Sequence, residues 1–181
     1  MVEKSAGMSH PLLILTGAYF VELVVVIYFT RATLRRVVGA LAGGVAVALM
    51  SLGMIGLCEA LGWWRIPFAS TTFLMTMLGI GLAISCSPIY LITWRIARRF
   101  GWRGLAVFAG VVIVIGPPRD YLIALKHPEW MVFSPGAAPI LADAVAYLGI
   151  VLLGHAVMRF VSGASGADVL RTTWRRGPSA R

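Results

Sequence analysis

The sequence is poor in charged residues, and acidic residues are the scarcest of them. Only 13% of its 181 residues are charged, with 16 Lys and Arg against 7 Asp and Glu. Soluble globular domains carry about 25% charged residues, so an ordinary water-soluble domain is excluded. The net charge of +9 does not indicate nucleic-acid binding, because the basic residues lie in short loops between apolar runs, as membrane topology signals do.

The sequence also lacks the residues of a metal or disulfide framework. It has two cysteines and three histidines, and no Cys-x-x-Cys or His-Glu-x-x-His motif brings them to ligand spacing. Cys58 and Cys86 are predicted about 25 Å apart along neighbouring helices, too far for a disulfide. Phosphate-binding and nucleophile-elbow motifs are absent. We therefore expect neither a metal nor a cofactor.

Long apolar runs are what the sequence has in abundance. Hydrophobic residues make up 59% of the chain, in runs long enough to cross a hydrocarbon core of about 30 Å. The pattern predicts an all-α polytopic membrane protein with a single five-helix transmembrane domain in residues 1–166, followed by a basic cytoplasmic tail in residues 167–181. The predicted spans are about 11–30, 37–61, 70–94, 104–125 and 140–161.

The distribution of Lys and Arg predicts the orientation of these spans. The first loop, the third loop and the C-terminal end carry twelve of the 16 basic residues, and the other side carries four, Lys4, Arg65, Arg119 and Lys126. Because cytoplasmic loops are enriched in Lys and Arg, the N-terminus is expected outside and the C-terminus in the cytoplasm. We expect a multi-pass protein of the cell inner membrane.

The stretch Gly116–Trp130 is the most polar part of an otherwise apolar chain. The apolar run before it, Leu105–Ile115, covers only about 17 Å, so the fourth helix can span only if it continues through Pro117–Pro118 and carries Arg119 and Asp120 with it. A kink or break is expected at the two prolines. The alternative is a short fourth helix followed by an ordinary outer loop.

Charged side chains in lipid cost roughly 2.5 to 3.5 kcal/mol on insertion scales, so these charges are expected to face the bundle. Glu22 is predicted to lie about 16 Å below the outer membrane surface. An acid at that depth marks a functional site by default, and the alternative is that Glu22 only fixes the packing of the helices. We expect Arg119 to meet Asp143 or Glu22 in a cluster open to the outer side. The catalytic candidates are Glu22, Asp120 and Asp143; the substrate-binding candidates are Arg119, Glu59, Tyr121, Trp63, Trp64 and Trp130.

These features predict an integral membrane protein with an outward-facing polar pocket that binds or modifies a lipid-like or other membrane-soluble small molecule. Paired carboxylates with an arginine would suit an acid–base step, although the sequence leaves open whether any reaction is catalysed. The alternative is a non-catalytic scaffold or accessory subunit of a membrane complex. Gly-rich helix faces, such as Gly39-x-x-x-Gly43, either pack internally or dock a protein partner or a second copy. A transporter is less favoured, because no internal repeat is visible.

Overall fold

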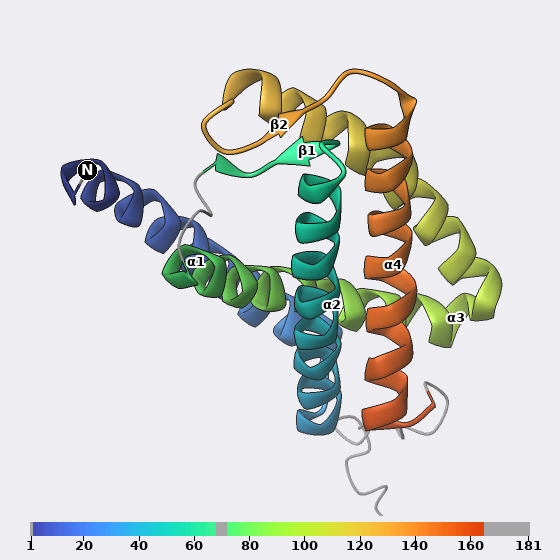
Figure 1. The fold of residues 1–181 in the computed structure, drawn as a ribbon. Coiled ribbons are helices and arrows are strands. Elements are labelled where there is room, and N and C mark those ends of the chain that lie inside the picture. The colour runs from blue at the N-terminus through green and yellow to red at the C-terminus, as the bar shows by residue number, and fades with distance from the viewer. Residues whose placement is uncertain (1, 68–71, 165–181) are drawn as a thin grey trace, which may run out of the picture.

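The computed structural model describes residues 2–67 and 72–164, and Figure 1 shows their arrangement. The described chain forms four helices and one two-stranded sheet: α1 (Val2–Thr30), α2 (Leu34–Ala60), β1 (Trp64–Arg65), α3 (Thr72–Lys126), β2 (Val132–Phe133) and α4 (Ala137–Ser162). The all-α prediction is confirmed. The predicted tail at 167–181 lies outside the described residues.

Three of the described helices are long and apolar enough to cross a bilayer. They are α2, α3 from Leu74 onward, and α4. In α1 the stretch Gly17–Thr30 is apolar but shorter. Both α2 and α4 begin and end within one turn of the predicted second and fifth spans. By helix length and composition, the chain is a multi-pass membrane protein.

Helix α3 joins the two segments that the sequence assigns to a third and a fourth span. The predicted loop at residues 95–103 is helical except at Gly101, which has φ 63° and ψ −153°. Glycine adopts a positive φ without the steric penalty of a Cβ atom. The helix therefore turns at this residue, and its two legs run in different directions in Figure 1.

The sequence predicts a kink or a break at Pro117–Pro118, and the break is not found, because α3 continues through both prolines to Lys126. A kink at these prolines stays a prediction. Prolines are tolerated in membrane helices where neighbouring protein supports the backbone. That support is visible at Gly116, where an added Cβ atom would lie 2.5 Å from the Tyr147 ring of α4. Arg119 and Asp120 are consequently in a helix and not in a loop.

A small sheet, which the sequence does not predict, ties the connections at one end of the molecule together. Strands β1 and β2 are antiparallel, with Trp64 opposite Phe133 and Arg65 opposite Val132. The Trp64 and Phe133 rings meet edge to face at 5.7 Å. The sheet joins the end of α2 to the connection before α4, and Figure 1 shows it at the top, opposite the start of α2 and the end of α4.

Glycines on α2 set its contacts with α3 and α4. A Cβ atom on Gly43 would lie 2.6 Å from the carbonyl oxygen of Gly154 in α4, and one on Gly44 would overlap the carbonyl oxygen of Ala83 in α3. Gly154 in turn lies against the ring of the fully buried Tyr90, whose hydroxyl donates to a carbonyl of α4. This glycine face therefore packs internally.

We predict that Gly43→Ala destabilises the protein, because the new methyl group has no space against α4. Inserting a methyl group into a close-packed contact costs about 1–3 kcal/mol. Gly56→Ala is the matched control: it lies on the same helix with nothing within 4 Å of an added Cβ atom, and alanine is the better helix former. The measurement is the thermal unfolding midpoint of both variants in detergent. Equal midpoints would contradict the assigned contact.

Candidate functional site

The polar stretch from Gly116 to Trp130 is divided between a helix and a turn. Its second half follows α3, where His127 Nδ1 lies 3.2 Å from Glu129 Oε1 and the His127 ring stacks on Trp130 at 4.8 Å. A backbone hydrogen bond to the Glu129 carboxylate, together with His127, lowers the pKa of Glu129. These exposed side chains bond to one another in the turn, so within this stretch it is the first half that contributes polar groups to the helix bundle.

In the first half, Arg119 and Asp120 form a closed network with Tyr147 of α4. Arg119 donates from Nε and Nη2 to Asp120 Oδ1 at 3.0 and 2.9 Å, and from Nη2 to the Tyr147 hydroxyl at 2.6 Å. The Tyr147 hydroxyl donates to Asp120 Oδ2 at 2.7 Å. We call these three residues the α3–α4 polar network. The Arg119 side chain is 62% exposed and that of Asp120 is 17% exposed, so the network has one open side.

Asp143 lies beside this network but is not bonded to it. It is one turn before Tyr147 on α4, is 6% exposed, and lies within electrostatic range of Arg119 and Asp120. Its Oδ2 atom has no hydrogen-bond partner among the described residues. An unsatisfied buried polar atom costs about 1–3 kcal/mol, and more when charged. The buried carboxylate is therefore a position that a ligand or water donor would stabilise.

Two further buried polar atoms without a partner lie in the same region as Asp143. The Tyr121 hydroxyl and Trp64 Nε1 make no hydrogen bond in the described part of the chain, and Tyr121 lies within electrostatic range of Asp143. Tyr121 stacks on Phe133 at 4.1 Å, and Phe133 meets the Trp64 ring. Trp64 packs with Ala142, the neighbour of Asp143. Three unsatisfied polar groups thus come from α3, β1 and α4.

Arg119 does not hydrogen-bond to the partners expected from sequence, Asp143 and Glu22. Its hydrogen bonds go to its own neighbour Asp120 and to α4. Glu22 is exposed on α1 and makes no hydrogen bond or ion pair within the described residues. Tyr19, one turn earlier on α1, is the residue in electrostatic range of Arg119 and Asp120. Helix α1 therefore approaches the network through a tyrosine.

The remaining substrate-binding candidates lie toward the edge of this region. Trp63 is half-buried and packs against the buried cluster around Trp64, whereas Glu59 is exposed at the end of α2. Trp130 stacks on His127 in the turn. The structure thus gathers Arg119, Tyr121 and Trp64 with the two aspartates, and it leaves Glu59 and Trp130 outside.

Metal or redox chemistry has no visible centre in the part of the chain that is described. No group of three or more His, Cys, Asp or Glu side chains there could hold a metal ion. Cys58 and Cys86 are both buried and free. What the site can do is hydrogen-bond a polar group and hold it beside two carboxylates.

Arg36 has a structural role that the sequence pattern indicates only in retrospect. It is 1% exposed and donates to Ser162 Oγ at 3.1 Å and to the carbonyls of Gly163 at 2.6 Å and Ala164 at 2.7 Å. It therefore satisfies the carbonyls of the two residues that directly follow α4 and holds this end of the helix against α2. The feature of the sequence that points to this role is the spacing of Arg36. It precedes Gly39 by three residues and therefore lies on the same face of α2 as the small residues.

Comparison of the chain with protein-family models, with curated proteins and with solved structures finds no match. The function is therefore argued from the residues themselves.

We predict that Tyr147→Phe lowers the free energy of unfolding by about 1–2 kcal/mol, because it removes one hydrogen bond from Arg119 and one to Asp120. Tyr28→Phe is the control: that side chain is 77% exposed and its hydroxyl makes no hydrogen bond in the described structure. Chemical or thermal unfolding of the two variants in detergent checks the difference. A Tyr147→Phe protein as stable as Tyr28→Phe would show that the network adds nothing to the α3–α4 contact.

Proposed function

We propose that the chain is an integral inner-membrane protein that binds a lipid-like or other membrane-soluble small molecule beside the α3–α4 polar network. The observation that carries this proposal is the buried, unpartnered Oδ2 atom of Asp143, with two unpartnered donors in the same region. Buried polar atoms in folded proteins nearly always have a partner. Three exceptions in one region are best explained by a molecule that supplies the missing hydrogen bonds.

The chemistry of the region defines the polar end of this molecule. Arg119 and Asp120 neutralise each other, so the site does not require a strongly charged ligand. Asp143 requires a donor, such as a hydroxyl or amine, and the Tyr121 hydroxyl and Trp64 Nε1 offer donors to an acceptor. A hydroxylated head group with its own acceptor oxygen meets all three requirements.

Exposed apolar side chains beside the network suit the hydrophobic part of the same molecule. Those on the second leg of α3 and the first turns of α4 include Leu122, Leu125, Ile140, Leu141 and Val145. An acyl or isoprenoid chain could lie along them at the lipid-facing surface. Asp120 and Asp143 would also suit an acid–base step on the bound head group, but the proposal itself is binding.

The five-span topology that the sequence predicts would place the network on the outer side. At about 1.5 Å per residue, each leg of α3 on either side of Gly101 is long enough to cross about 30 Å of hydrocarbon. The contact of Arg36 with the segment just after α4 brings the first basic loop to the same end as Arg159, in the last turn of α4. Excess Lys and Arg at one end indicates the cytoplasmic side, so the network would face the outer half of the membrane.

We predict that fusions at the two ends of α4 report opposite sides of the membrane. Alkaline phosphatase placed after Pro135 should be active, because it is exported, and green fluorescent protein at the C-terminus should fluoresce in the cytoplasm. An epitope at the N-terminus should be accessible from outside intact spheroplasts. An N-terminus protected together with a cytoplasmic C-terminus would give an even number of spans and contradict the five-span topology.

A scaffold or accessory subunit is the second candidate function. The hydrogen bonds from α3 to Tyr147 of α4 would then serve only to lock the two helices together. The open surface of α2 around Gly53 and Gly56, where an added Cβ atom meets nothing, would accept a partner helix. Both candidate functions predict the same fold, and they differ in what happens when the Asp143 carboxyl is replaced by an amide.

We predict that Asp143→Asn leaves the folded yield unchanged but lowers the amount of co-purified lipid-like ligand about tenfold, the effect of losing roughly one hydrogen bond. Yield is measured by gel filtration in detergent, and ligand by extraction and mass spectrometry. Glu59→Gln, an exposed acid at the same end, is the control and should retain the ligand. Lost yield with unchanged ligand content would favour the scaffold.

A further inference from the structure

The bend of α3 carries aromatic and basic side chains where the two legs beside it are mostly apolar. Residues 98–103 have the sequence Arg-Arg-Phe-Gly-Trp-Arg, and Gly101 holds the positive φ at which the two legs meet. Phe100 is 60% exposed and Trp102 is 76% exposed. In Figure 1 this bend, drawn in yellow-green, lies at the edge of the bundle on the side away from the N-terminus. We call these six residues the α3 tip.

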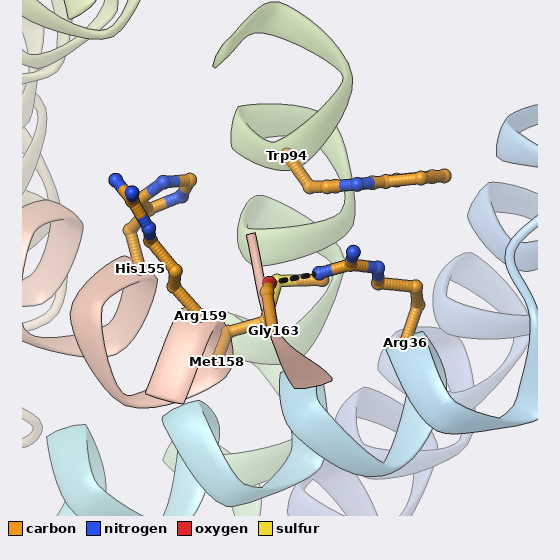
Figure 2. A pocket seen from close by; sticks show the side chains of 6 residues that line it. All are labelled: Arg36, Trp94, His155, Met158, Arg159 and Gly163. Atoms are coloured by element: carbon orange, nitrogen blue, oxygen red, sulfur yellow. Dashed lines mark hydrogen bonds between the residues drawn. The ribbon is translucent and has the colours of Figure 1, made fainter. Parts of the chain in front are cut away.

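Contacts just before the α3 tip place it at the end of the bundle where α1 ends and α2 begins. The Arg95 guanidinium donates to the carbonyl of Phe29, in the last turn of α1, at 3.5 Å. Figure 2 shows the Trp94 ring above Arg36, in the first turn of α2, whose guanidinium lies 5.3 Å from the ring centre. The tip begins four residues after Trp94, which is about 6 Å of helix, so it belongs to the same end.

The exposed arginines of the α3 tip have no acidic partner in the chain around them. No Asp or Glu occurs between Glu59 and Asp120, and the tip lies within that interval. Arg99 and Arg103 are exposed and make no hydrogen bond or ion pair among the described residues. The Arg99 guanidinium lies over the Phe100 ring, 5.2 Å from its centre. The tip therefore presents positive charge that the described protein does not neutralise.

Exposed aromatic rings between arginines suit the head-group layer of a bilayer better than either water or hydrocarbon. A tryptophan is favoured in that layer because its ring is apolar while its N–H can donate. Above the membrane, Phe100 and Trp102 would leave apolar surface in water. Inside the hydrocarbon, the arginines would be costly. In the layer between, guanidinium groups can pair with phosphate oxygens in bidentate geometry.

We propose that the α3 tip docks on anionic phospholipids of the membrane leaflet at this end of the bundle. Phe100 and Trp102 lie among the head groups, and Arg99 and Arg103 bond to the phosphates. Charge complementarity carries the choice of partner, because the exposed arginines meet no acid in the chain. An anionic leaflet favours each basic residue near its surface about fivefold.

Docking of the tip also sets the depth of the α3–α4 polar network. Arg119 follows Gly101 by 18 residues on the second leg of α3, which is about 27 Å of helix. A hydrocarbon core is about 30 Å thick, so a tip held at one interface places Arg119 close to the other. This consequence goes beyond the proposed ligand, because it holds whether or not the network binds one.

The test measures which phospholipid lies beside Trp102 in the full-length protein. The protein is placed in phosphatidylcholine nanodiscs with increasing fractions of brominated phosphatidylglycerol or brominated phosphatidylcholine, whose bromine atoms quench nearby tryptophans. The difference between native and Trp102→Phe emission isolates Trp102. We expect phosphatidylglycerol to associate there at least fivefold more strongly than phosphatidylcholine. Trp130, 37% exposed beside Glu129 at the opposite end, is isolated in the same way and should show less than about twofold preference.

Two changes should abolish the preference at Trp102. Arg99→Gln/Arg103→Gln should lower it to less than about twofold, because both phosphate contacts are lost. In the native protein, about 0.5 M NaCl should lower it as well, because salt screens exposed charges. A preference below twofold at Trp102 in the native protein at low salt would overturn the proposal. A preference that survives both the double variant and the added salt would overturn it too.

Arg31→Gln/Arg35→Gln is the matched control, because it removes the same charge from two exposed arginines at the same end but outside the tip. It should change the preference at Trp102 by less than about twofold. An equal loss in the two double variants would overturn the proposal, since the lipid would then respond to the overall charge of this end. All four arginines are exposed, so their replacement leaves the core undisturbed.

Discussion

The close contact between the backbones of α2 and α4 is the constraint on which the rest of the structure depends. Lipid gives helices no hydrophobic reason to associate, so packing and interhelical hydrogen bonds have to hold them. Gly43 and Gly154 let the two backbones approach, and Gly44 does the same for α3. Tyr90 then fills the space against Gly154 and donates its hydroxyl to α4. A side chain at any of these glycines would separate helices whose opposite ends carry the polar groups.

Because α4 is a continuous helix, fixing it at Gly154 also fixes the groups on both sides. Two turns toward the sheet, Tyr147 packs against Gly116 and closes the network with Arg119 and Asp120. Beyond its other end, the carbonyls of Gly163 and Ala164 accept from Arg36. The polar groups at both ends are therefore positioned by one helix crossing. Both ends also depend on α3, which bends at Gly101.

Helix length and the charge pattern predicted much of this from sequence, whereas the partners of individual polar groups could not be predicted. The shortness of Leu105–Ile115 correctly placed Arg119 and Asp120 in a helix. The sequence predicted a loop at residues 95–103, where the structure has only a turn at Gly101. Several arginines around a glycine look like a connection between spans, but arginine is also a good helix former. Strands of two residues are too short to show periodicity. That Arg119 bonds Tyr147, and not Glu22, depends on how α1 lies across α3, which no local pattern encodes.

Charge at the end with the sheet is balanced within the chain, and this balance decides what kind of ligand that end suits. Arg119 is neutralised by its neighbour Asp120, and what remains unsatisfied is a set of hydrogen-bonding groups near Asp143. A neutral, hydroxylated amphiphile meets that need. At the other end Arg36 is held by the chain itself, through hydrogen bonds to Ser162 Oγ and to the carbonyls of Gly163 and Ala164. Both arginines therefore hold α4 to its neighbours, and the requirement for a ligand comes from the groups near Asp143.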